Sequence, residues 1–255
     1  MKQSQPASAA LYLRSLAFWA VFMLSTLVLS VIVVLLFPLP FRIRYAPARF
    51  WGVMNIWWLG KTCGLRHEVE GLEHIVNLHS GIVLCKHQST WETLALHLWF
   101  KPSAWVLKRE LLKVPFFGWG LALTDPIAID RKAGRKAVEQ LVEQGRERLR
   151  DNRWVIIFPE GTRIAAGKRG RYRIGGAALA VESASPVIPM AHNAGEYWPR
   201  RGFIKHPGII KVRIGPAIDP QGKSAQQIMD ETQQWIETEM EKITTLSEHQ
   251  HGART

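Results

Sequence analysis

An uninterrupted stretch without charge, from Leu16 to Phe37, has the strongest bearing on how this chain folds. As an α-helix it would be about 33 Å long, enough to cross a hydrocarbon core of about 30 Å. A secretory signal peptide has a shorter apolar region followed by a small-x-small cleavage site, and neither feature is present. We therefore predict that the stretch is retained and that it contacts a membrane.

The segment after this stretch leaves two arrangements open. A short aromatic run at residues 50–59 is too short to span a bilayer, and it suits either the lipid–water interface or a helix packed on the rest of the protein. The N-terminus is therefore predicted to be a single membrane helix or a helical hairpin that lies in one leaflet. The flanking charges favour a cytoplasmic location for the rest of the chain: Lys2 and Arg14 before the stretch, and Arg42, Arg44 and Arg49 after it.

The remainder of the chain alternates apolar strand-like runs with helical patterns. The clearest helical pattern covers residues 134–150, and residues 223–245 form a second amphipathic pattern. Such alternation predicts an α/β fold with a largely parallel central sheet flanked by helices. The predicted division is an N-terminal membrane-anchoring segment (1–60), a catalytic domain (61–245) and a disordered tail (246–255). The strand candidates are residues 81–85, 104–107, 126–129, 154–158, 187–190 and 209–214.

The composition narrows the classes of molecule that the protein can bind. The formal net charge is +12 and 47% of the residues are hydrophobic, so the chain should seek an anionic partner. We expect a phospholipid membrane and no nucleic acid, because no zinc-finger spacing or recognition-helix signature accompanies the charge. The two cysteines, Cys63 and Cys85, do not suggest a disulfide framework, and Cys85 is expected to pack as a small hydrophobe rather than act as a nucleophile.

A strand-to-helix turn at residues 85–92 carries candidate chemistry. If Ser89 caps the helix, Glu92 is its third residue and lies near the positive end of the helix dipole. The bend can then bring the His87 imidazole to the carboxylate, which would fix the tautomer and leave the other ring nitrogen free as a base. Two structural alternatives stay open: Ser89 and Glu92 form a capping box, and His87 is a hydrogen-bonded structural residue.

A second turn follows the strand candidate 154–158, where the sequence continues as Pro-Glu-Gly-Thr-Arg. Gly161 allows the backbone to approach a ligand closely, and Arg163 offers a bidentate fork for phosphate or carboxylate. The glycine-rich basic loop at 167–176, with Lys168 and Arg169, is a further candidate for binding phosphates, or else a solvated flexible loop.

Together these two turns resemble those of the glycerolipid acyltransferase family, and within it the lysophosphatidic acid acyltransferases. There, a His followed five residues later by an acidic residue is the first motif, and Phe-Pro-Glu-Gly-Thr-Arg is the third. Residues 127–131 are similar to the second motif and residues 187–190 to the fourth, so the likeness covers about residues 65–215. The family usually has Asp where this chain has Glu92.

The resemblance implies an O-acyltransferase that moves a fatty acyl group from a thioester to the sn-2 hydroxyl of 1-acylglycerol 3-phosphate and so gives phosphatidic acid. His87 would be the base and Glu92 would steady its imidazolium, with no metal, no cofactor and no covalent acyl-enzyme. Acyl-CoA or acyl carrier protein would be the co-substrate, and a bacterial inner membrane the location. Glu160 would orient Arg163 or accept a glycerol hydroxyl. The residues expected to hold the lysophospholipid acceptor are Arg131, Glu160, Gly161, Thr162 and Arg163, with Lys168 and Arg169 as weaker candidates.

Three alternatives remain. The acceptor can be glycerol 3-phosphate, another lysophospholipid or a lyso-aminolipid. A metallohydrolase built from His87, Glu92 and His97 is disfavoured, because zinc ligands on one helix face are three or four residues apart. The third alternative is a membrane lipid-binding protein without turnover.

Overall fold

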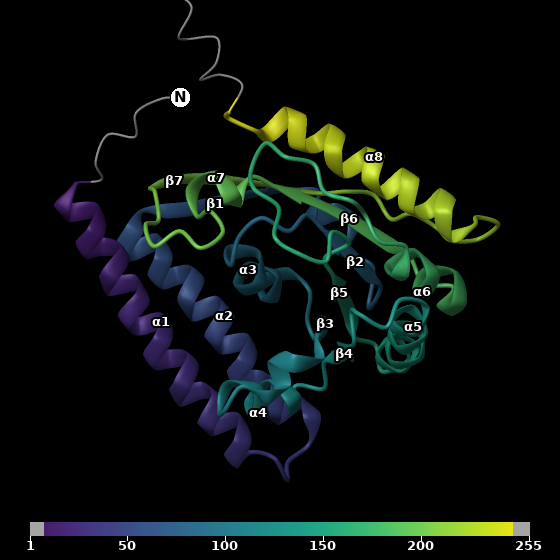
Figure 1. Cartoon of the computed structure of the whole chain (residues 1–255), viewed down its shortest axis with the longest axis horizontal. Helices are drawn as coiled ribbons and strands as arrows, with labels where there is room; N and C mark the ends of the chain where they lie inside the picture. The colour runs from purple at the N-terminus through teal and green to yellow at the C-terminus, as the bar shows by residue number, and fades with distance from the viewer. Residues whose placement is uncertain (1–7, 247–255) are drawn as a thin grey trace, which may run out of the picture.

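The computed structural model describes residues 8–246, which form a seven-stranded sheet with helices on both faces (Figure 1). The spatial order of the strands is β1-β7-β6-β2-β5-β3-β4. All neighbouring strands are parallel except β6 and β7, which are antiparallel. The predicted α/β fold with a largely parallel sheet is therefore confirmed. The strands are β1 (Leu65–Glu70), β2 (Ile82–Cys85), β3 (Ser103–Lys108), β4 (Ile127–Ile129), β5 (Trp154–Ile157), β6 (Val187–His192) and β7 (Gly208–Ile214).

The two sheet faces have separate apolar cores because side chains alternate along each strand. In β2, Val83 and Cys85 pack on one side, while Ile82 and Leu84 pack on the other. The first core lies against α1 (Ala9–Leu35), α2 (Phe41–Cys63) and α3 (Trp91–Trp99). The second lies against α5 (Arg135–Arg150), α6 (Gly175–Ser183) and α8 (Ala225–Ile243). Short helices α4 (Phe117–Ala122) and α7 (Ala194–Tyr197) and 3-10 turns at Leu72–His74 and Arg109–Lys113 complete the fold.

The N-terminal helices form a hairpin, which is one of the two arrangements that the sequence left open (Figure 1). α1 is long and apolar enough to cross a membrane. The aromatic run belongs to α2, which packs on the catalytic part, since Ile56 and Leu59 are buried in the first core. The boundary predicted at residue 60 falls inside α2, and the proposed division of the chain stays a prediction. The predicted tail lies outside the described residues except for Leu246.

α1 touches the rest of the protein near both of its ends. Towards its start, Ser15 accepts a hydrogen bond from the backbone N–H of Lys205 (3.0 Å), and the fully buried Phe18 meets Trp198 edge-to-face with 5.2 Å between ring centroids. Towards its end, Ser30 lies against Gly120 of α4. The helix therefore lies along the domain, and only its outer side is free.

A buried lysine reinforces the first of these contacts. The ammonium of Lys205 lies 3.6 Å from the ring centroid of Trp19 and donates to the carbonyl oxygen of Phe203 (2.7 Å). Burial lowers the pKa of Lys205 to about 7. The aromatic rings favour the charged form, so the cation is held by π-faces and a carbonyl oxygen.

Candidate active site

The turn between β2 and α3 is held by one oxygen of Glu92. Its Oε1 atom lies 2.8 Å from Nδ1 of His87 and accepts the backbone N–H groups of Gln88 and Ser89 at the same distance. A carboxylate only accepts hydrogen bonds, so Nδ1 of His87 carries the hydrogen and Nε2 carries the lone pair. The predicted bend therefore brings the imidazole to the acid and leaves a basic nitrogen free.

The predicted cap of α3 is wrong by one residue. Thr90 occupies the cap position and the helix begins at Trp91, so Glu92 is its second residue. The hydroxyl of Ser89 donates to the carbonyl oxygen of Trp198 (2.6 Å) and accepts from the N–H of Trp91 (3.2 Å). Glu92 thus satisfies backbone donors and binds the imidazole at once, and the two interpretations of this residue are compatible.

Glu92 is fully buried yet favours its charged form. Burial alone would raise its pKa, but the nearby His192 and His87 and the Ser89 N–H outweigh burial, and the pKa lies below its ordinary value. The acid is therefore ionised at neutral pH, as is required to stabilise an imidazolium on His87.

Two further rings surround this pair. Phe158 stacks on His87 with 3.9 Å between centroids and an interplanar angle of 11°, which restrains the imidazole plane. His192 of β6 is fully buried, donates from Nε2 to the carbonyl oxygen of Lys86 (2.8 Å) and lies 3.8 Å from Oε2 of Glu92. The sequence analysis did not select either ring. The signal for His192 was its position on the same strand as the fourth motif.

Other candidate chemistries are not supported by the geometry. The Cys85 thiol is fully buried and donates to the carbonyl oxygen of Lys86 (3.2 Å), and burial raises its pKa, so it is not a thiolate nucleophile. Nδ1 of His97 lies 3.2 Å from the Tyr45 hydroxyl, whereas Nδ1 of His87 binds Glu92. Within residues 8–246, no group of three or more His, Cys, Asp and Glu side chains is arranged to hold a metal ion.

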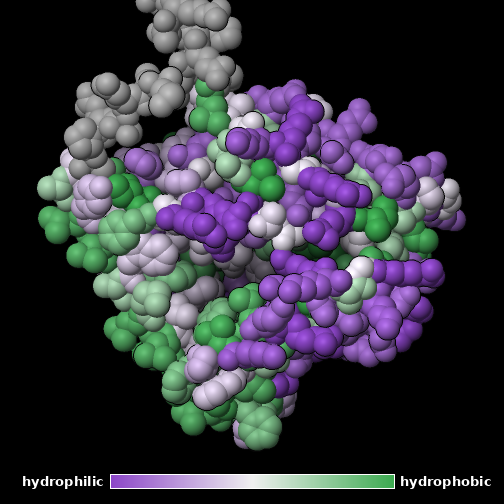
Figure 2. All heavy atoms as spheres, viewed as in Figure 1, coloured by the Kyte–Doolittle hydropathy of each residue, from purple (hydrophilic) through white to green (hydrophobic). Residues whose placement is uncertain are grey.

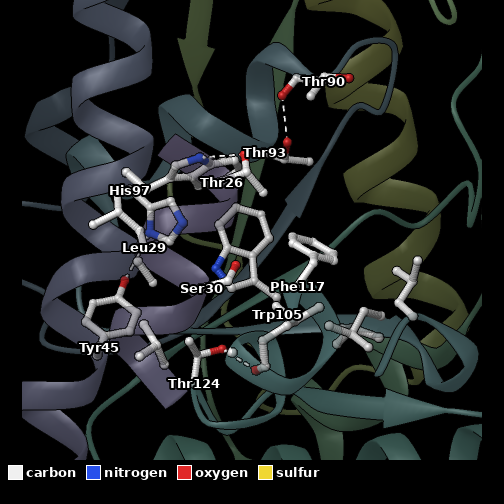
Figure 3. Close-up of a pocket in the computed structure, with 18 of the residues that line it drawn as sticks. Thr26, Leu29, Ser30, Tyr45, Thr90, Thr93, His97, Trp105, Phe117 and Thr124 are labelled. Carbon is white, nitrogen blue, oxygen red and sulfur yellow. Dashed lines mark hydrogen bonds between the residues drawn. The ribbon is translucent and has the colours of Figure 1, made fainter. Parts of the chain in front are cut away.

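A cavity of about 440 Å³ has His87 among its lining residues. Figure 3 shows this cavity, with Tyr45, His97 and Trp105 among the side chains around it. Its walls come from α1, α2, α3, β3 and the α4 region, and most of them are apolar. Arg131 and Arg163 line it as well, so it joins a basic end to an apolar interior. Among the other lining residues are Phe22, Leu29, Val33, Ala48, Trp105, Leu107, Leu111, Phe117 and Leu121.

Two of the residues that the sequence selected for phosphate binding, Arg131 and Arg163, line the basic end, and Gly161 lies beside them. The Nη1 atom of Arg131 donates to the carbonyl oxygen of Gly161, and Arg163 reaches the cavity two residues later. Gly161 has φ +67°, and a Cβ there would lie 2.9 Å from Nε of Arg173, so no other residue fits without strain. Burial lowers the pKa of both Arg131 and Arg163. The structure thus places the guanidinium groups of Arg131 and Arg173 beside Gly161. Arg173 belongs to the basic loop 167–176 that the sequence predicted, although it was not singled out there.

Other predicted acceptor residues lie elsewhere. Thr162 is exposed beside Gly161. Lys168 and Arg169 do not line the cavity, and Arg169 pairs instead with Glu237 and Glu241 of α8. These two residues were predicted as weaker phosphate ligands, and the carboxylates of α8 account for the direction of Arg169.

The predicted role of Glu160 is wrong, because its carboxylate binds other partners than those expected. Its carboxylate does not orient Arg163: Oε1 binds the ammonium of Lys86 (2.7 Å) and Oε2 accepts the backbone N–H of His87 (3.0 Å). The side chain is fully buried beneath the turn because the Lys86 charge and the His87 N–H satisfy it there.

Comparison with known proteins defines the class. Residues 66–193 match the sequence profile of the family described as Acyltransferase. The chain belongs to this acyltransferase family and is an enzyme, and the family generally needs no cofactor.

Individual relatives narrow the comparison. The chain is 48% identical over 214 residues to the 1-acyl-sn-glycerol-3-phosphate acyltransferase of Pseudomonas aeruginosa, covering 82% of this chain and 83% of that protein. It is 30% identical over 169 residues to the 1-acyl-sn-glycerol-3-phosphate acyltransferase alpha of Mus musculus, covering 65% of this chain and 59% of that protein. The crystal structure of the 1-acyl-sn-glycerophosphate acyltransferase PlsC of Thermotoga maritima has the same fold, with TM-score 0.74, 22% identity and coverage of 91% and 95% of the two chains.

Substitution of Glu92 by Gln tests the charge of this residue separately from its geometry. Three N–H donors converge on Oε1, so the amide oxygen of Gln should take the same place and keep the His87 tautomer. Losing only the charge should lower kcat about 10- to 100-fold, the usual difference between a charged and a neutral acceptor. Steady-state kinetics and melting temperature are measured together, with Glu92→Asp as the variant that keeps the charge. Wild-type kcat in Glu92→Gln would show that the carboxylate charge has no part in the reaction.

Proposed function

We propose that this enzyme transfers a fatty acyl group from a thioester to the sn-2 hydroxyl of 1-acylglycerol 3-phosphate and releases phosphatidic acid. The observation that carries the proposal is the His87–Glu92 pair, which lies beside a cavity lined by two arginines and by mostly apolar side chains. The names of the relatives from Pseudomonas aeruginosa and Mus musculus support the same acceptor.

The reaction is a direct transfer. Nε2 of His87 accepts the proton of the acceptor hydroxyl while that oxygen attacks the thioester carbonyl carbon. The tetrahedral intermediate then collapses, the carbon–sulfur bond breaks, and the imidazolium returns the proton to the departing sulfur. Glu92 stabilises the imidazolium between these steps. A thioester is already activated, so no acyl-enzyme is needed, and positioning supplies much of the rate.

The arginines select the acceptor. A phosphomonoester carries up to two negative charges and several acceptor oxygens, which suit the forked donors of Arg131 and Arg163. The glycerol hydroxyl lies only a few bonds from the phosphate, so a phosphate held at Gly161 presents that hydroxyl to His87. The backbone of the two motifs is joined directly, because the N–H of Ile164 donates to the carbonyl oxygen of His87 (2.8 Å).

The apolar interior of the cavity takes the acyl chain of the donor. Its volume falls in the range of small-molecule sites, and Tyr45 and His97 are among the residues that line it. Burial lowers the pKa of His97 to about 4, so this ring is neutral and adds no charge to the chamber. The donor is a thioester of coenzyme A or of acyl carrier protein, and the net charge of +12 suits either acidic carrier.

The helical hairpin supports a location on one leaflet of the membrane. Ser15 and Ser30 are about 22 Å apart along α1, and the domain contacts α1 near both positions. If α1 crossed the bilayer, part of the catalytic domain would lie in hydrocarbon. The apolar outer side of α1 and α2 (Figure 2) instead suits a helix pair that lies in the leaflet, with the domain on the cytoplasmic side of a bacterial inner membrane.

An acceptor assay tests the function. Purified protein in detergent micelles, given lysophosphatidic acid and a long-chain acyl thioester, should form phosphatidic acid faster than it acylates glycerol 3-phosphate or a phosphodiester lysolipid. His87→Ala should lower kcat by on the order of 10³ or more, because the hydroxyl proton then has no base. Products are identified by mass spectrometry. Unchanged turnover in His87→Ala, or faster turnover of another acceptor, would contradict the proposal.

Narrowing the chamber should change the donor preference. Ala48 lines the cavity, and Leu at this position fills space that the end of a long chain would use. For the longest donor that wild type accepts, kcat/KM should fall about tenfold, the effect of a few excluded methylene groups. Short donors should change less than about twofold. Ala46→Leu, at an exposed position of the same helix, is the matched control. Equal effects of the two variants on all donors would show that the acyl chain of the donor does not occupy this cavity.

Charges on the outer side of α1 should weaken membrane binding without harming the site. Leu24 and Leu35 are 62% and 73% exposed and do not line the cavity. Replacing both with Glu should lower the partition coefficient into phosphatidylglycerol-containing vesicles at least about tenfold. Each substitution replaces a leucine side chain that would be buried in lipid with a charged one. Turnover of a short-chain, micelle-free lysolipid should be unchanged. The control is Val181→Glu on α6, which lies across the sheet. Equal vesicle binding by wild type, the double variant and this control would show that the outer side of α1 does not bind the membrane.

A further inference from the structure

A buried set of charges connects α8 to the turn that carries His87. The ammonium of Lys86 is 2.7 Å from Oε1 of Glu160 and 2.7 Å from Oε1 of Glu237 on α8. The side chains of Lys86, Glu160 and Glu237 are 1%, 0% and 10% exposed. One ammonium therefore lies between two carboxylates where water does not screen the charges.

The α8 end of this set is fixed by two more groups. The Tyr172 hydroxyl donates to Oε1 of Glu237 (2.9 Å), and Nε of Arg169 lies 3.6 Å from Oε2. These donors offset the second negative charge, so Glu237 stays in place to bind Lys86. Within residues 8–246, neither Lys86 nor Glu237 lines the cavity, so neither contacts substrate there.

The other end of the set is the peptide of His87. Oε2 of Glu160 accepts the His87 N–H, and Oε1 of the same carboxylate binds Lys86. The Lys86 ammonium thus fixes the position of the Glu160 carboxylate, and this carboxylate in turn fixes the main chain of His87. Burial raises the pKa of Glu160 and the Lys86 charge opposes that effect, so removing Lys86 would favour a neutral acid, a weaker acceptor.

We propose that Lys86 and Glu237 are positioning residues for the acyl transfer: Glu237 fixes the Lys86 ammonium, Lys86 fixes the Glu160 carboxylate, and Glu160 fixes the main chain of His87. The inference rests on the proposed function and adds α8 to the catalytic apparatus. The inference predicts a specific pattern of mutational effects, because the Lys86 ammonium lies between two carboxylates. Without Lys86, two buried carboxylates lie close together and cannot both stay ionised, so Glu160 tends to become neutral and to bind the His87 N–H more weakly. Removing the Glu237 charge as well relieves this repulsion and lets Glu160 stay ionised.

Kinetics of four variants test the inference. Lys86→Met should lower kcat about 100-fold with KM for lysophosphatidic acid within about threefold, because the base is misplaced while the phosphate site is intact. Lys86→Met/Glu237→Gln should recover about tenfold of that loss, since the opposing charge is gone. Lys86→Arg keeps the charge and should stay within about fivefold of wild type. Glu231→Gln, at an exposed position of α8 whose carboxylate pairs with Lys223 and not with this set, should have wild-type kcat.

Several outcomes would overturn it. They are a wild-type kcat in Lys86→Met, a double variant no faster than Lys86→Met alone, and a loss that resides in KM. A loss of kcat that matches a loss of folded protein, measured by thermal unfolding, would assign Lys86 a purely structural role.

Hydrogen exchange tests the same coupling without substrate. In the full chain, Glu237→Gln and Lys86→Met should speed amide exchange in the peptide that contains His87 and leave α5 unchanged. Glu237→Gln serves where Lys86→Met does not fold. If wild type fails to acylate lysophosphatidic acid, the proposed function is wrong, and the exchange result still decides the coupling. Unchanged exchange at His87 in the variants would refute the coupling itself.

Discussion

A single buried oxygen, Oε1 of Glu92, gathers three N–H groups and thereby shapes the turn on which the chemistry depends. Two of these donors belong to the backbone and one to His87, so folding of the turn and choice of the imidazole tautomer are the same event. An acid buried this deeply would ordinarily tend to be neutral. The donors and His192 keep it ionised, so in the proposed reaction the charge that holds the turn is also the charge that stabilises the imidazolium.

The hairpin of α1 and α2 has two sides with different surroundings. One side forms walls of the cavity beside His87, through residues such as Leu29 and Ala48. The other carries exposed apolar side chains, for example Leu24 and Leu35. The same helices thus form walls of the cavity and carry the apolar surface that we propose contacts lipid. This arrangement explains why residues far from the motifs in sequence, such as Phe18, are among the most deeply buried.

Much of the fold could be predicted because strands buried on both faces give continuous apolar runs. β1 was missed because Leu65–Glu70 lies at a sheet edge and has only two apolar residues, Leu65 and Val69. The motif residues His87, Glu92, Arg131 and Arg163 could be placed near one another, since parallel strands end at the same edge. The partners of Glu160 could not be predicted. In the sequence, Lys86 has no feature that distinguishes it from other cations beside turns, and Glu237 has none that distinguishes it from other acids on amphipathic helices. Only the packing of α8 across the sheet brings them together.

The position of Glu237 also bears on what counts as a complete enzyme of this kind. The family profile ends at residue 193, and all recognisable motifs lie before that point. A shortened chain that ended there would retain every signature residue, yet its buried ammonium would have lost one of two counter-ions. On the proposed coupling, motif content and catalytic self-sufficiency are separate properties, and a minimal active fragment would have to extend through α8.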